Sequence, residues 1–173
     1  MVETGKIVEK IKAFFFIAGP DRFEKIRKDS FGDILAYYAV MLVVFFAGSV
    51  IVALGTNIAY IPMAILLEII ATAIFIIIYF VLAKLLGGQG SLMDMARVFV
   101  YGGTPLYLFG WIPYLGIIGL ASLWNMVNGT MALFKLSRMR AMIVVLLPLI
   151  IMIALFVAMM LYLTPIPASP APL

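Results

Sequence analysis

The sequence predicts an all-α integral membrane protein of five transmembrane helices, preceded by an N-terminal amphipathic interfacial helix. Hydrophobic residues make up 66% of the 173 positions and charged residues only 12%, about half the charged share of a typical soluble domain. Apolar stretches long enough to cross a bilayer recur along the chain. The basic residues are confined to alternate connections between these stretches, as expected for a multi-pass membrane protein.

Each span is predicted from about 20 mostly apolar residues, the length that crosses the hydrocarbon layer. Ile34–Leu54, Ile61–Leu86 and Ala141–Leu163 meet this condition as single stretches. Asp94–Phe134 is about twice that length and is predicted to form two spans joined by a tight turn at WIPYLG. The first of these two has the weaker hydropathy because it contains the sequence GGTP, and a re-entrant hairpin over residues 94–134 is the alternative.

The distribution of basic residues predicts the orientation. All 12 Lys and Arg lie in the N-terminal segment, at the glycine-rich connection after the second span, or in the connection before the last span. Because basic loops stay on the cytoplasmic side, we expect a cytoplasmic N-terminus and an external C-terminus in the cell membrane. The chain thus divides into a cytoplasmic amphipathic and basic segment (1–33), a transmembrane domain (34–163) and a proline-rich outer tail (164–173). Tyr37 and Tyr38 are predicted to lie in the inner aromatic belt.

The N-terminal segment carries an apolar pattern of helical period. Ile7, Ile11, Phe14 and Phe15 recur at helical spacing, while Lys and Glu residues occupy the other faces. This pattern predicts an amphipathic helix on the cytoplasmic leaflet, with a break at Gly19–Pro20. Two further roles are open for the segment: docking of a protein partner, and attraction of anionic lipid to its basic residues.

The absence of cysteine and histidine excludes several classes of chemistry. Disulfides, Cys or His metal sites, catalytic triads and imidazole proton relays all require these residues. The stretch LLGGQGSLMD lacks the Gly-Lys-Ser/Thr ending of a phosphate-binding loop and lies between two membrane helices. We interpret it as a turn in which Gly87, Gly88 and Gly90 allow positive φ, with Ser91 capping the next helix and Asp94 three residues on. No cofactor, metal or nucleic acid is expected.

Glu68 is the most informative single residue, because a carboxylate inside a span costs several kcal/mol unless it is paired, hydrated or protonated. Counting along the helices places Thr104 and Tyr107 at a similar depth. We expect the Tyr107 hydroxyl to donate a hydrogen bond to Glu68. The carboxyl is interpreted either as a satisfied structural group or as part of an ion or proton pathway.

The fourth predicted helix has a face of small and polar residues. Such residues let helices approach closely in lipid and form hydrogen bonds between them. Asn125 and Asn128 fall near mid-bilayer, and close packing against Gly102 and Gly103 is the expected use, with a polar cavity as the alternative. The residues of this face are Gly116, Gly119, Ser122, Asn125 and Gly129.

Several motifs follow one another in a distinctive order along the chain. They are a GG-containing turn, a VYGGTP segment, IPYLG, a polar-faced helix, a basic turn of the KLSRMRA kind and a last apolar span. Their characteristic residues are Gly87, Gly88, Tyr101, Gly102, Gly103, Pro105 and Pro113. This order of elements resembles the Yip1 domain family. The resemblance implies five spans and a cytoplasmic N-terminus. Eukaryotic members act in Golgi traffic and bind Rab GTPases, but their DLYGP-type motif is absent here. The short N-terminus looks more like that of a prokaryotic or archaeal member.

These patterns predict a non-enzymatic membrane-embedded scaffold or adaptor that organises the membrane or binds partners. The alternative is a small oligomeric channel or transporter with a polar path near Glu68, Asn125 and Asn128. An intramembrane enzyme is disfavoured because acids are few and no nucleophile–base pair is visible. The expected partners are the lipid bilayer, with anionic lipid at the cytoplasmic face, and a second copy of the chain or another membrane protein.

Overall fold

The computed structural model describes residues 4–52 and 58–163, and over these residues it contains helices and no strand. The predicted outer tail (164–173) lies outside the described residues. In chain order the elements are α1 (Thr4–Phe14), α2 (Pro20–Lys25), η1 (Ile26–Lys28), α3 (Phe31–Val52), η2 (Ile58–Tyr60), α4 (Ile61–Leu85), α5 (Leu92–Gly102), α6 (Thr104–Phe109), η3 (Leu115–Leu120), α7 (Ala121–Phe134) and α8 (Arg138–Leu163).

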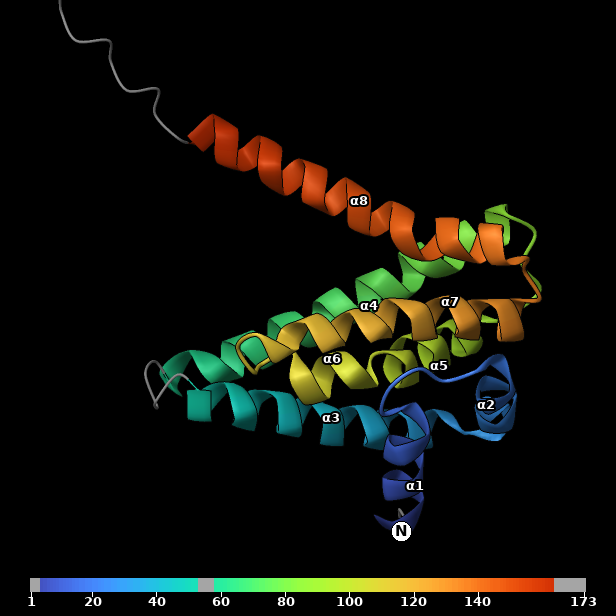
Figure 1. The fold of residues 1–173 in the computed structure, drawn as a ribbon, viewed down its shortest axis with the longest axis horizontal. Coiled ribbons are helices and arrows are strands. Elements are labelled where there is room, and N and C mark those ends of the chain that lie inside the picture. The colour runs from blue at the N-terminus through green and yellow to red at the C-terminus, as the bar shows by residue number, and fades with distance from the viewer. Residues whose placement is uncertain (1–3, 53–57, 164–173) are drawn as a thin grey trace, which may run out of the picture.

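Within the described residues, four helical stretches are long and apolar enough to cross a membrane. They are α3, α4, η3 with α7, and α8. The segment predicted as the third span is instead broken into α5 and α6, neither of which is long enough alone. Pro105 in the first turn of α6 explains the break, because proline lacks an N–H and its ring clashes with the carbonyl four residues earlier. Together α5 and α6 lie beside α7 and α3 (Figure 1).

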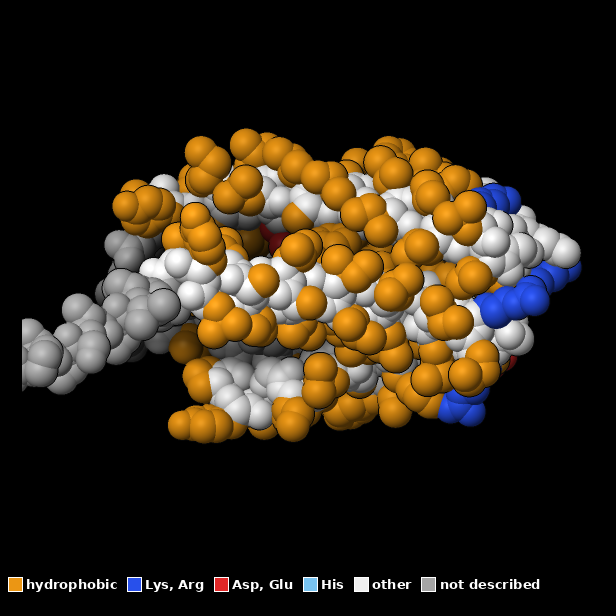
Figure 2. Space-filling model, turned by 90° about the horizontal axis from the view of Figure 1, so that it is seen from above, with side chains coloured by type: hydrophobic (Ala, Val, Ile, Leu, Met, Phe, Trp, Pro, Cys, Tyr) orange, Lys and Arg blue, Asp and Glu red, His pale blue; other side chains and the backbone are white. Residues whose placement is uncertain are grey.

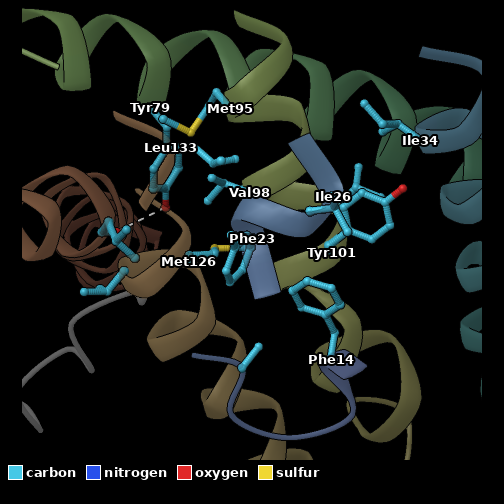
Figure 3. Close-up of a cluster of buried hydrophobic side chains, with 14 of the residues drawn as sticks. Phe14, Phe23, Ile26, Ile34, Tyr79, Met95, Val98, Tyr101, Met126 and Leu133 are labelled. Carbon is cyan, nitrogen blue, oxygen red and sulfur yellow. Dashed lines mark hydrogen bonds between the residues drawn. The ribbon is translucent and has the colours of Figure 1, made fainter. Parts of the chain in front are cut away.

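Helix α5 lies at the centre of the molecule. It packs against α7, α4 and α3, and the N-terminal elements α1 and η1 contact it as well. Its buried side chains Met95, Val98 and Tyr101 meet Phe14 from α1 and Phe23 from α2 in one cluster (Figure 3). The N-terminal segment is therefore part of the folded core, although the sequence indicated a separate segment beside the bundle.

Helix α8 belongs to the bundle along only part of its length. Its buried residues are Ala141, Val144, Val145 and Pro148, and every residue from Ile150 to Leu163 is exposed. In Figure 1 the far half of α8 extends away from the other helices. Because lipid is as apolar as these side chains, such a surface is stable in a bilayer and would not be in water.

The outer surface has two chemically distinct regions. Figure 2 shows a face covered by hydrophobic side chains, with Lys and Arg side chains gathered at one end. We call this the basic end; it is where α4 ends, α5 begins, α7 ends and α8 begins. The long exposed apolar helices and this charge distribution identify a multi-pass membrane protein with a helical bundle.

The two tyrosines near the start of α3 are not interfacial. Tyr37 is completely buried and Tyr38 is 7% exposed, so the predicted aromatic belt is wrong for both. The Tyr37 ring lies 4.7 Å from the Tyr101 ring and is tilted 50° to it, and the Tyr38 ring meets the edge of the Tyr107 ring at 5.9 Å. Their hydroxyls find partners inside the bundle, which removes the need for contact with interfacial water.

Candidate functional site

The glycine-rich turn closes the basic end of the bundle. Gly87 has φ +88°, and the Gln89 amide donates to the carbonyl of Phe134 at 2.9 Å. A Cβ on Gly88 or Gly90 would approach the Phe134 ring to 2.8–2.9 Å. The predicted turn is confirmed, but of its three glycines only Gly87 has the expected positive φ. Gly88 and Gly90 instead allow close contact with the end of α7.

The predicted cap of α5 is also confirmed. Ser91 Oγ accepts a hydrogen bond from the Asp94 amide, and the Asp94 carboxylate accepts from the Ser91 amide at 2.9 Å. Asp94 also pairs with Arg97 at 2.8 Å. Burial raises the pKa of Asp94, but the hydrogen bonds from Ser91 and the charge of Arg97 outweigh it, so the pKa falls below the ordinary value of 3.8.

A polar cluster then joins the N-terminal segment to α5. Asp29, between η1 and α3, accepts a hydrogen bond from the Tyr101 hydroxyl at 2.6 Å and forms an ion pair with Lys10 at 2.7 Å. Arg97 donates to the backbone carbonyl of Asp29 at 2.5 Å. Lys10 of α1 also donates to the Tyr101 hydroxyl at 3.3 Å. We call Lys10, Asp29, Arg97 and Tyr101 the tether cluster.

The two asparagines of α7 hold the loop between α1 and α2. Asn125, which is fully buried, accepts from the Ala18 amide at 2.7 Å and donates to the Phe16 carbonyl at 2.6 Å. Asn128 donates to the Ala18 carbonyl at 2.9 Å. Because a buried non-helical backbone needs partners for its polar groups, these amides make the loop position possible.

Aromatic packing completes the attachment of the N-terminal segment. The Phe14 ring lies 4.9 Å from Phe23 and 5.5 Å from Tyr101. A Cβ on Gly129 would come within 2.6 Å of the Phe23 ring, so only glycine permits this approach. The small face of α7 therefore receives the N-terminal segment at Gly129. Gly102 of α5 also packs closely on α7, because a Cβ there would lie 3.2 Å from the Met126 side chain. The predicted contact of Gly103 with the same helix is wrong, since a Cβ on Gly103 would meet Phe99 and Tyr107 instead.

A second row of polar groups runs deeper into the bundle from α3. Tyr37 and Thr104 share a 2.8 Å hydrogen bond, and Thr104 also donates to the Tyr101 carbonyl at 2.7 Å. Tyr38 donates to Thr72 at 2.9 Å, and Thr72 donates to Glu68 at 3.4 Å. These contacts place Thr104 with Tyr37 rather than beside Glu68.

Glu68 is half-buried, and its hydrogen-bond partner differs from the predicted one. Thr72 lies one turn further along α4 and makes the contact with the carboxylate that was expected from Tyr107. Tyr107 is buried against the ring of Tyr38, which in turn bonds Thr72. Thr72 makes this contact because a threonine four residues away on the same helix reaches the carboxylate without any alignment between two helices.

The residues of the VYGGTP and IPYLG segments have separate positions. Tyr101 is in the tether cluster, Gly102 lies against α7, and Gly103 separates α5 from α6. Pro105 is buried in the first turn of α6, and Pro113 is exposed in the turn before η3. The VYGGTP segment therefore contributes Tyr101 to the tether cluster and Gly102 to the close contact with α7. Gly103 and Pro105 lie at the break in the third predicted span.

The tether cluster contains residues that the sequence did not single out. The sequence places Lys10 on a polar face of the amphipathic helix and Arg97 beside the glycine-rich connection, and it gives Asp29 no role beyond the charged N-terminal segment. One signal was available: Arg97 lies three residues beyond Asp94 in a largely apolar helix and needs a partner there. The pairing with Asp29 spans 68 positions of sequence and had no local signal.

The polar and charged side chains described above can form hydrogen bonds and ion pairs with another molecule. They also hold the N-terminal segment against α5 and α7. No group of three or more His, Cys, Asp or Glu side chains in the described part of the chain could hold a metal ion.

The comparison with known proteins agrees with this picture. The family model of the Yip1 domain matches residues 16–159, from the loop before α2 to near the end of α8. Neither a curated protein nor a solved structure matches the chain. The matched region includes the turn, the VYGGTP segment and the asparagines of α7. The chain belongs to the Yip1 domain family.

Proposed function

We propose that this protein is a non-enzymatic membrane adaptor. Its N-terminal segment, residues 4–28, is a fixed surface for a protein partner, and we call this surface the platform. The observation that carries the proposal is the attachment of the loop between α1 and α2 to Asn125, which bonds both Phe16 and Ala18. A segment that served only to orient the bundle at a membrane surface would need no such buried polar attachment. Fixing a binding surface in advance lowers the entropy cost of association.

The exposed surface of the platform is strongly charged. Glu24 and Arg27 are 3.7 Å apart and half-exposed, so their charges remain available to a partner. Both signs are present, which favours a protein surface with complementary charges over a simple anionic surface. The exposed charged residues are Lys6, Glu9, Lys12, Asp21, Arg22, Glu24, Lys25, Arg27 and Lys28.

We propose that the protein lies in the cell membrane with the platform on the cytosolic side, and that the chain crosses the membrane five times. The third of these crossings is supported by the course of α5 and α6. After its capped first turn α5 runs away from the basic end, and α6 continues in that direction beside α7 (Figure 1). Helix α1 runs across the direction of the bundle helices, as an interfacial helix would. Basic residues at one end favour the cytosolic side for the N-terminus and the opposite side for the C-terminus.

Photo-crosslinking in cells tests the adaptor proposal. A photoreactive residue replaces exposed Lys25 on the platform, and another replaces Tyr162, which is 89% exposed at the far end of α8. We expect discrete protein adducts from position 25 and lipid adducts alone from position 162. Asn125→Leu keeps the side-chain volume but removes both loop contacts, so the adducts from position 25 should fall several-fold.

Val127→Ala is the matched control for this experiment, because Val127 is buried on the same helix and none of the loop's hydrogen bonds involves it. It should leave the adducts unchanged. The proposal is wrong if position 25 gives no protein adduct, or if Asn125→Leu and Val127→Ala have equal effects.

Transport is the second candidate, and the half-buried Glu68 in a spanning helix is the observation that favours it. The amides of Asn125 and Asn128 are engaged by the N-terminal loop, which weighs against the predicted polar path through them. Proteoliposomes separate the two functions. Proton or ion flux that Glu68→Gln abolishes supports transport, whereas no flux above that of empty liposomes supports the adaptor.

A further inference from the structure

A pocket lies between the N-terminal helices α1 and α2. Its volume is about 310 Å³, at the lower end of the range of small-molecule binding sites, so it suits a small polar group. Ala13 and Phe14 line it from α1 and Ile26 lines it from η1, which makes part of its wall apolar. The rest of the lining is charged and comes from α1, from α2 and from Asp29, the residue that follows η1.

Basic side chains outnumber acidic ones in this lining. The Lys10 ammonium pairs with the Asp29 carboxylate at 2.7 Å, so these two charges compensate each other. Arg22 and Lys25 of α2 then outweigh Glu9, and the excess positive charge of the pocket attracts anions. The charged lining residues are Lys6, Glu9, Lys10, Arg22, Lys25 and Asp29.

Arg22 is held at the pocket by a contact with α1. One of its guanidinium nitrogens donates a hydrogen bond to the carbonyl of Ala13, which is itself a lining residue. A guanidinium has five N–H donors, so after this contact it keeps enough of them to bind a phosphate. Lys25 lies three residues after Arg22, on the same face of α2, and its side chain is exposed. Both cations of α2 therefore lie beside the same cavity.

The start of α3 indicates the depth of the pocket in the membrane. Helix α3 is long and apolar enough to span a membrane, and it begins two residues after Asp29. Its 22 residues rise about 33 Å, close to the ~30 Å thickness of the hydrocarbon core. The first turn of α3 therefore lies at the boundary of the hydrocarbon, and Asp29 with the pocket lies at the level of the lipid headgroups.

Exposed hydrophobic side chains follow the pocket along the chain. Phe16 and Ile17, two and three residues after the lining residue Phe14, are 55% and 60% exposed. The Phe16 ring stacks at 6.0 Å on Phe109, the last residue of α6, which runs away from the basic end (Figure 1). The loop thus places apolar groups beside the pocket, towards the hydrocarbon. A phospholipid has both an anionic group and acyl chains, whereas a soluble phosphate or an acidic peptide would leave this apolar surface uncovered.

We propose that the pocket between α1 and α2 binds the headgroup of one anionic glycerophospholipid from the leaflet at the basic end. The phosphate contacts Arg22 and Lys25, and the acyl chains extend past Phe16 into the bilayer. The Glu24–Arg27 pair, which is offered to a protein partner, does not line the pocket. The lipid site therefore goes beyond the proposed adaptor function and does not depend on it.

Native mass spectrometry of the full chain in mild detergent tests the site without any protein partner. The protein is titrated separately with phosphatidylglycerol, with phosphatidylcholine carrying the same acyl chains, and with the soluble ester sn-glycerol 3-phosphate. We expect one retained phosphatidylglycerol per chain, in clear preference to both other compounds. Lys25→Gln should weaken this retention about fivefold, the effect of one basic residue near an anionic surface.

Lys28→Gln is the matched control for the loss of charge. Lys28 is exposed on η1, three residues after Lys25, and it does not line the pocket. The Lys28→Gln protein should retain phosphatidylglycerol nearly as well as the unsubstituted protein. Circular dichroism of each variant confirms that the helices are intact.

Removing an acid from the lining should have the opposite effect. Glu9 lines the pocket, whereas Glu24 lies outside it beside Arg27. Glu9→Gln should strengthen retention of phosphatidylglycerol severalfold, because it removes a like charge from the neighbourhood of the phosphate. Glu24→Gln should leave retention unchanged. A gain of retention in Glu9→Gln cannot result from unfolding, so this pair of variants separates binding from stability.

The proposal fails if phosphatidylglycerol and phosphatidylcholine are retained equally, or if Lys25→Gln and Lys28→Gln have the same effect. It also fails if Glu9→Gln retains no more lipid than Glu24→Gln. Retention of sn-glycerol 3-phosphate as strong as that of phosphatidylglycerol would assign the pocket to a soluble phosphate ester and overturn the lipid site. Displacement of phosphatidylglycerol by an equal concentration of triglutamate would overturn it in favour of an acidic peptide.

Discussion

The Tyr101 hydroxyl donates a 2.6 Å hydrogen bond to the carboxylate of Asp29, across 72 positions of sequence. This bond connects the central helix α5 to the chain just before α3. Tyr101 also receives a hydrogen bond from Lys10 of α1, so one phenol joins three parts of the protein. The position of the N-terminal segment depends on this residue together with Asn125.

Removing the Tyr101 hydroxyl should destabilise the fold. Tyr101→Phe removes the hydrogen bond from the hydroxyl to the Asp29 carboxylate and the one from Lys10 to the hydroxyl, and leaves only the ion pair between Asp29 and Lys10. The loss of a hydrogen bond to a charged group costs about 1–3 kcal/mol. Urea unfolding in detergent micelles measures the change in the free energy of unfolding. Tyr162→Phe is the control, since Tyr162 is exposed and should change stability by less than about 0.5 kcal/mol. Equal effects of the two substitutions would contradict the role of Tyr101.

Asn125→Leu should release the loop between α1 and α2 without unfolding the bundle. The Ala18 amide loses its 2.7 Å acceptor, so its hydrogen exchange should accelerate on the order of ten- to a hundredfold. Exchange monitored by mass spectrometry on peptides covering residues 14–20 measures this change. The same peptides in Val127→Ala should exchange at the original rate. Unchanged protection in Asn125→Leu would show that the loop is held by other contacts.

Gly129→Ala should disrupt the contact with α2. The added Cβ would lie 2.6 Å from the Phe23 ring, and such overpacking typically costs about 1–3 kcal/mol. The thermal unfolding midpoint should fall, and a second substitution, Phe23→Leu, should recover part of the loss in the Gly129→Ala background. Gly5→Ala is the control because a Cβ there meets no atom within 4 Å. A Gly129→Ala protein as stable as Gly5→Ala would refute the close approach.

Acid should weaken the start of α5 through Asp94. Because the pKa of Asp94 in the folded protein is lower than its ordinary value of 3.8, the carboxylate stabilises the fold fully above that value. The contribution is lost as pH falls below about 4, through the lower pKa of the folded state. Ser91→Ala removes the side-chain hydrogen bond to the Asp94 carboxylate, one of the contacts that lower its pKa, and leaves the bond from the backbone amide in place. The unfolding free energy should therefore vary less with pH below about 4. Identical pH dependence in both proteins would argue against this linkage.

The sequence by itself determined the membrane class, the helical fold and four helical stretches of spanning length. It also determined the Gly87 turn and the Ser91 cap. These features depend on local information: apolar length, the left-handed φ that glycine permits, and a cap formed within four residues. The break at Pro105 has a local cause too, since proline cannot continue a helix, although the sequence predicted only a weaker span there.

The tertiary structure alone decided which polar groups meet. Asn125 was expected in a helix contact or a polar cavity and instead holds the backbone of the N-terminal loop. Glu68 was expected to bond Tyr107 and instead accepts from Thr72. The physical reason is that lipid-facing and core-facing apolar side chains are equally hydrophobic, so hydropathy does not fix the rotation or depth of a membrane helix. Close packing and the pairing of buried polar groups fix both, and they act between residues far apart in the chain.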